Sequence, residues 1–162
     1  MDVKTLDDQI DLVRRDSLVE FVRYTNEFTL RSKAIAELLK PRIHRGAEKF
    51  EHYVKVHGQL KLEDERKLLE SHRRDLQEVY FRMCCCHEKN ESLIVENSDL
   101  SRLYYRYAHC PGVLAQKHLL KRKNEDIRRF IKIFEFCDEV YKEFLIKADR
   151  RMRAYYLELH PV

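Results

Sequence analysis

Thiol and imidazole side chains cluster at one place in the chain, where Cys84, Cys85 and Cys86 are followed directly by His87. A structural zinc site uses these ligand types but needs four of them to converge on one point. Successive side chains on a helix point about 100° apart, so only Cys84 and His87 would share a face. Cys137 would add a third ligand at most. We therefore predict no metal site and expect these thiols to pack as small apolar side chains, with Cys86 facing Cys137.

Catalytic motifs are equally scarce. A di-iron centre in a helical bundle uses Glu-x-x-His pairs, and none of the eight histidines has Glu three residues before it. Three glycines do not fit a nucleophile elbow or a phosphate-binding loop. His109 and Cys110 are neighbours on a predicted turn, and adjacent residues rarely meet as base and nucleophile. We predict that the chain is not an enzyme and uses no cofactor.

Basic residues gather in two parts of the sequence, although 32 Lys and Arg against 28 Asp and Glu leave a net charge of only +4. A basic patch could bind an acidic protein, an anionic membrane or RNA. The alternative is a solvated face neutralised by nearby carboxylates. The candidate residues of the patch are Lys121, Arg122, Lys123, Arg128, Arg129, Arg42, Arg45, Lys147, Arg150 and Arg151.

Four other residues are candidates for a partner or oligomer interface. Asn90 and Asn97 fall at successive a positions of a predicted heptad pattern, where a buried amide selects register or oligomer state. The alternative is that this part of the apolar helix stripe faces a gap between helices and is exposed to water. Tyr105 and Arg106 lie in the sequence RLYYRY and would remain on the surface beside the seam. Aromatic residues and arginine are typical of protein interfaces.

The elements that must position these side chains are predicted to be long helices. Glycine and proline together contribute 6 of the 162 residues, whereas an average protein has about 7% Gly and about 5% Pro. Apolar residues recur every three or four positions through about 4–57, 60–108 and 113–160. The middle segment also fits the a and d positions of about seven heptads.

The glycines and prolines that interrupt these patterns suggest how the helices connect. We expect chain reversals at Gly58 and at His109 to Gly112, and a kink at Pro41 within the first helix. The sequence shows us no convincing repeat unit. The predicted fold is a single all-α domain over 1–162, an elongated up-down-up antiparallel three-helix bundle with coiled-coil-like heptads. This arrangement would bring Lys147 to Arg151 beside Arg42, Arg45 and Lys49.

The expected location is cytoplasmic or nuclear. Five cysteines, three of them consecutive, do not resemble a disulfide framework and indicate a reducing compartment. The N-terminus carries acidic residues where a secretory signal would be basic and then apolar. The most apolar stretch, 130–137, is far shorter than the roughly 20 residues of a membrane span. We therefore expect a protein that is not secreted and has no transmembrane segment.

The leading functional expectation is a noncatalytic scaffold or adaptor that associates with itself, as a homodimer, or with partner helices in a hetero-oligomer. A second candidate is binding to an anionic membrane surface, because three long helices, a kink and basic residues resemble the general plan of BAR-type dimers. Nucleic-acid binding through the clusters around Lys121 and Arg150 ranks below both.

Overall fold

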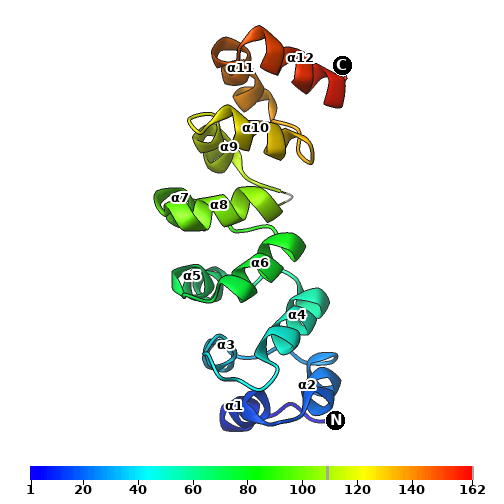
Figure 1. The fold of residues 1–162 in the computed structure, drawn as a ribbon. Helices are drawn as coiled ribbons and strands as arrows, with labels where there is room; N and C mark the ends of the chain where they lie inside the picture. The colour runs from blue at the N-terminus through cyan, green and yellow to red at the C-terminus, as the bar shows by residue number, and fades with distance from the viewer. Residues whose placement is uncertain (109, 162) are drawn as a thin grey trace. The chain divides into compact units, whose positions relative to one another are not determined.

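The computed structural model describes residues 1–108 and 110–161, and within them it contains twelve short α-helices, one 3-10 turn and no strand (Figure 1). The predicted all-α class is confirmed. The three-helix bundle is wrong, because each of the three predicted long helices is divided into several short ones. His109, where the second reversal was predicted to start, lies outside the described residues.

The chain divides into two compact units, the first of which is 1–84. Its helices run in pairs, and the first helices of successive pairs contact one another, as do the second helices. Three helix pairs therefore stack within this unit (Figure 1). In chain order they are α1 (Leu6–Arg14) with α2 (Leu18–Thr25), α3 (Ser32–Leu38) with α4 (Gly46–His57), and α5 (Leu62–Glu70) with α6 (Arg74–Met83).

The second unit, 85–162, follows the same plan after a 3-10 turn, η1 (Glu88–Asn90). Here α7 contacts α9, α9 contacts α11, α8 contacts α10 and α10 contacts α12. The helices are α7 (Glu91–Glu96), α8 (Ser98–Tyr107), α9 (Val113–Leu119), α10 (Asn124–Ile131), α11 (Asp138–Lys147) and α12 (Arg150–Leu159). Stacks of helix pairs of this kind are typical of α-helical repeat proteins.

Polar side-chain caps begin four of the short helices. Thr5, Ser17, Asn97 and Asp149 each begin a helix, and the side-chain oxygen of each accepts a hydrogen bond from the backbone N–H three residues later. Such caps satisfy donors that a helix leaves free at its first turn. Asn97 is thus an exposed cap at the start of α8, where the heptad pattern had predicted the interior of a long helix.

Pro41 lies in a turn between two helices. The helix before it, α3, ends at Leu38, and α4 begins at Gly46. Arg42 and Arg45 have positive φ angles of 70° and 50°, so the chain leaves helical geometry completely here. The predicted kink is wrong because proline lacks the donor that would continue the helix and restricts the residue before it. The predicted end at Gly58 is confirmed, since α4 ends at His57 and Gly58 has a φ of 74°.

A repeat is present in the buried positions. The second helices of the pairs begin at 18, 46, 74, 98, 124 and 150, that is, 24 to 28 residues apart. Each of these helices buries an aromatic side chain in a corresponding place: Tyr24, Tyr53, Tyr80, Tyr104, Phe130 and Tyr156. In four pairs the tyrosine hydroxyl accepts a hydrogen bond from a backbone N–H 20 to 23 residues earlier, that of Lys4, Leu30, Leu60 or Phe136. The expectation that no repeat exists is therefore wrong.

Buried polar side chains join one pair to the next. The Oε1 atom of Gln9 accepts from the backbone N–H of Arg31 at 2.9 Å, and Oε1 of Gln116 accepts from that of Cys137 at 3.0 Å. Both donors belong to the residue that precedes the first helix of the following pair. These bonds satisfy donors that would otherwise be costly to bury.

Glu91 makes a third bond of this kind, in which its Oε1 accepts from the N–H of Gly112 at 2.6 Å. A Cβ atom at residue 112 would overlap the Glu91 carboxyl group. A larger residue at this position would have to displace the Glu91 carboxyl group, although the φ of −77° would suit any residue.

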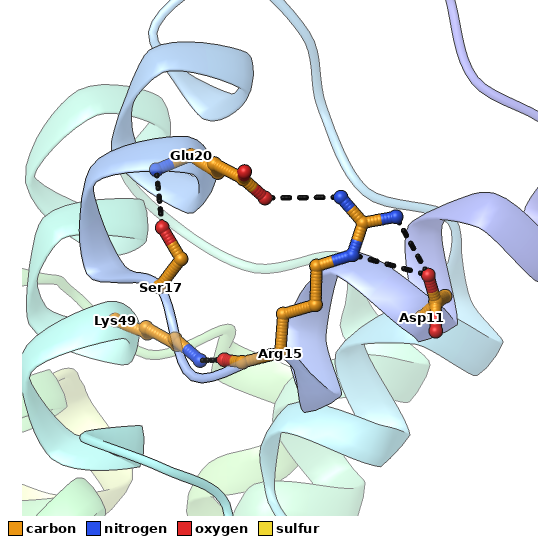
Figure 2. A network of polar contacts seen from close by, with 5 residues as sticks. All are labelled: Asp11, Arg15, Ser17, Glu20 and Lys49. Carbon is orange, nitrogen blue, oxygen red and sulfur yellow. Dashed lines mark hydrogen bonds and ion pairs between the residues drawn. The ribbon is translucent and has the colours of Figure 1, made fainter.

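A fully buried lysine holds the turn between α1 and α2 (Figure 2). The Nζ atom of Lys49, from α4, donates to the carbonyl oxygens of Val13 and Arg15 at 3.0 and 2.7 Å. Outside the same turn, the guanidinium of Arg15 pairs with Asp11 at 2.7 Å and with Glu20 at 2.9 Å. Burial lowers the pKa of Lys49. Its predicted place in a basic surface patch is therefore wrong.

Candidate anion-binding site

Four arginines line a small hollow between α8 and α10, two helices that contact one another in the second unit. Arg102 and Arg106 are four residues apart on α8 and therefore share a face. Arg122 precedes α10, and Arg129 lies on it. We call this the arginine hollow. Its lining residues are Arg102, Tyr105, Arg106, Arg122, Asp126 and Arg129.

The aromatic wall of the hollow is held rigidly. The hydroxyl of the buried Tyr105 donates to the carbonyl oxygen of Ala115 at 2.6 Å and lies 2.9 Å from Nδ1 of His118. Its ring lies nearly perpendicular to that of Phe130 in the core, with the ring centres 5.9 Å apart. Burial raises the pKa of Tyr105 far above its usual value, so the phenol stays neutral. The guanidinium carbon of Arg122 lies 5.5 Å from the centre of the ring, in a cation–π contact.

Positive charge in the hollow is only partly balanced. Arg122 pairs with Asp126 at 3.1 Å. Among the described residues, no carboxylate lies within ion-pair distance of Arg102, Arg106 or Arg129. Four guanidinium groups thus face one carboxylate. The arrangement offers several N–H donors and an excess of positive charge to an anion.

The structure brings together four of the residues selected from the sequence: Tyr105, Arg106, Arg122 and Arg129. Tyr105 forms a wall from a buried position, whereas it was predicted to be a surface contact. Arg102 was missed, although its spacing of four from Arg106 would have indicated a shared helix face. Three further predicted residues are near in sequence but do not line the hollow; they are the exposed Lys121, Lys123 and Arg128.

The remaining candidate residues lie elsewhere. Asn90 is buried at the end of η1. Arg42 and Arg45 lie in the turn before α4 of the first unit, where Arg45 pairs with Glu48 at 2.5 Å. The exposed Lys147, Arg150 and Arg151 belong to α11 and α12 of the second unit. The long antiparallel helices that were expected to bring these two groups together are not formed.

One disulfide is present. Cys85 and Cys110 are bonded, with their Cα atoms 5.5 Å apart, and Cys84, Cys86 and Cys137 form no disulfide. The sequence argument against disulfides failed here because residues 84–87 are not helical, so Cys85 is not held on a helix face. Cys86 is only partly buried, and burial raises the pKa of the Cys84 thiol to about 11. The described residues contain no group of three or more His, Cys, Asp or Glu side chains that could hold a metal ion.

Within residues 1–108 and 110–161, no helix combines the length and the apolar character that crossing a bilayer requires.

No family model matches the chain, and no curated protein or solved structure shows significant similarity to it. The arginine hollow and the stacked pairs are therefore the basis for a functional proposal.

Proposed function

We propose that the chain is a noncatalytic scaffold or adaptor that binds acidic segments of partner proteins through the arginine hollow. The observation that carries the proposal is that Arg102, Arg106 and Arg129 line one hollow without a carboxylate partner among the described residues. Arginine is among the residues that contribute most to protein interfaces, because its planar group binds carboxylates in a bidentate way.

The stacked helix pairs support the same function. The most extensive contacts of each pair are with its neighbours in the same unit, and such stacks present extended surfaces that bind partners. Rigid helices also hold an interface more firmly than loops do, and both sides of the arginine hollow are built on helices. A binding role thus suits the architecture.

Assembly into a homodimer or hetero-oligomer and a location inside the cell stay predictions. The longest described helix has 12 residues. Self-association through a long coiled coil is therefore no longer supported. The resemblance to BAR-type dimers depended on the same long helices, which are not formed.

A charge-reversal experiment tests the proposal. In the hollow variant, Arg102, Arg106 and Arg129 are all replaced by Glu. The matched control makes the same charge change at Arg128, Arg150 and Arg151, which are exposed in the same unit and do not line the hollow. The binding of a fluorescent polyglutamate peptide is measured by anisotropy, and proteins captured from a cell extract are quantified by mass spectrometry.

We expect the hollow variant to lose about tenfold or more in peptide affinity, equivalent to about 1.4 kcal/mol. It should also lose a defined set of captured proteins that the control retains. Circular dichroism would show that both variants remain helical. Equal losses in the two variants, or no loss in either, would contradict the proposal.

A further inference from the structure

We propose that the arginine hollow binds a phosphate monoester carried by a partner protein, so that phosphorylation of the partner controls the interaction. This inference rests on the proposed function and names the ligand of the same site.

The charge of the hollow fits a dianion better than a carboxylate. Arg102, Arg106 and Arg129 bring three positive charges that no described carboxylate neutralises. A phosphate monoester carries about −1.5 to −2 charges at pH 7 and has three strong acceptor oxygens. A glutamate side chain supplies one charge and two oxygens. The monoester therefore uses more of the available donors.

The spacing of the arginines also favours a bound anion. Arg102 and Arg106 stand four residues apart on α8, where like charges repel one another. An anion bound between the two guanidinium groups attracts both of them and offsets this repulsion. Arg129 reaches the hollow from α10, so the ligand would be gripped from both helices.

Two lining residues shape the hollow without adding net charge. Arg122 is fixed by its contact with the Tyr105 ring and by its ion pair with Asp126. Because Asp126 is paired, its carboxylate repels an incoming anion less than a free one would. The wall is therefore preorganised, and the three arginines without a carboxylate partner remain to bind the phosphate.

A single small hollow suits one phosphate group on a protein better than a nucleic-acid strand. A strand carries a row of phosphodiesters, each with one negative charge, and is bound along a basic track. Here the arginines line one small hollow on two neighbouring helices.

The test compares three fluorescent peptide pools with identical degenerate flanks and phosphoserine, glutamate or serine at the centre. We expect the phosphoserine pool to bind about tenfold more tightly than the glutamate pool, because hydrogen bonds to a doubly charged phosphate are stronger. Inorganic phosphate should compete. The same measurement is made with a single-stranded RNA oligonucleotide and with vesicles containing a phosphoinositide.

Conservative variants separate bidentate recognition from general attraction. Arg102→Lys combined with Arg129→Lys keeps the charge but removes the planar fork of donors, and we expect about a tenfold loss for the phosphoserine pool. The matched control, Arg128→Lys, should leave affinity unchanged. An effect of the double variant equal to that of the control would mean that only net charge matters and would overturn the inference.

The outcomes also separate this inference from the function on which it rests. If the glutamate pool binds as tightly as the phosphoserine pool, and phosphatase treatment of the extract leaves captured proteins unchanged, the phosphate ligand is wrong while the acidic-partner function stands. If RNA or vesicles bind more tightly than every peptide pool, the inference is also overturned. If no protein or peptide depends on the hollow arginines, both proposals fail.

Discussion

The hydroxyl of Tyr156 accepts a hydrogen bond from the backbone N–H of Phe136 at 3.0 Å, and that of Tyr53 accepts from the N–H of Leu30 at the same distance. In each case a histidine four residues later packs against the tyrosine ring, and its Nε2–H donates to a carbonyl at the end of the preceding second helix. The histidines are His160, which donates to Ile131, and His57, which donates to Thr25. The same arrangement, a tyrosine and a histidine that each bind a backbone group, is therefore found in both units.

Removing one of these hydroxyls should be costly. In Tyr156→Phe the N–H of Phe136 is left buried without its acceptor, so we expect the free energy of unfolding to fall by about 1–3 kcal/mol. Urea denaturation followed by circular dichroism measures the change. The control is Tyr155→Phe, at a neighbouring, partly exposed position with no hydrogen bond described for its hydroxyl, and it should change stability by less than about 0.5 kcal/mol. Equal effects of the two substitutions would contradict the anchoring role.

Glu91 should make stability depend on pH. Burial raises the pKa of Glu91 above its usual 4.5, while the N–H of Gly112 opposes the shift. Because the folded state holds the proton more tightly, this stabilising contribution is complete below pH 4.5. It is lost as pH rises through the folded pKa. Glu91→Gln keeps an acceptor for Gly112 and removes the buried charge, so the variant should be more stable than the parent at pH 7.

The measurement for Glu91 is urea unfolding at several pH values between 4 and 8. The exposed Glu96 provides the control, since Glu96→Gln changes the same net charge on the same helix. If Glu91→Gln and Glu96→Gln have the same dependence on pH, Glu91 does not carry the effect.

The disulfide should stabilise the second unit. Cys85 and Cys110 are separated by 25 residues, and closing a loop of that size in the unfolded chain contributes about 3 kcal/mol. We expect the double variant Cys85→Ser/Cys110→Ser to unfold at lower denaturant concentration than the parent. A reducing agent should destabilise the parent and leave the variant unchanged; a parent protein insensitive to reduction would argue against the bond.

Cys84 should react slowly with alkylating agents. Burial raises the pKa of Cys84 from 9.0 to about 11, so little thiolate forms at pH 8. We expect iodoacetamide to modify Cys86 and Cys137 first, with the rate at Cys84 rising toward pH 11, as measured by mass spectrometry. Stability should fall between pH 9.0 and about 11, since the unfolded thiol loses its proton first. Equal rates at all three thiols in folded protein would exclude this protection.

The all-α class could be predicted from spacing and composition, but the length of the helices could not. Apolar residues three and four apart occur both in one long helix and in several short helices stacked on each other. Side-chain caps mark the starts of four of the short helices, and the heptad pattern concealed two of these by placing Asn97 and Asp149 inside long helices. The repeat was hidden because the second helices begin 24 to 28 residues apart, so no fixed period exists.

The arginine hollow could be predicted only in pieces. Arg106 and Arg129 were each selected for their residue types, but that they share a site follows from the contact of α8 with α10, across the intervening α9. A model with antiparallel long helices places those residues differently. The Cys85–Cys110 bond was missed for a related reason, since a helix through 84–87 would fix the direction of Cys85.

The anchors of the helix pairs have an evolutionary consequence. The hydroxyls of Tyr53 and Tyr156 and the side chains of Gln9 and Gln116 all bind main-chain atoms of the residues they hold. A main-chain N–H is present whatever side chain is attached, proline excepted. The anchored positions are therefore free to change identity over generations while the anchors keep the pairs in place. Such a chain can diverge widely in sequence and still preserve the scaffold on which a new binding surface is selected.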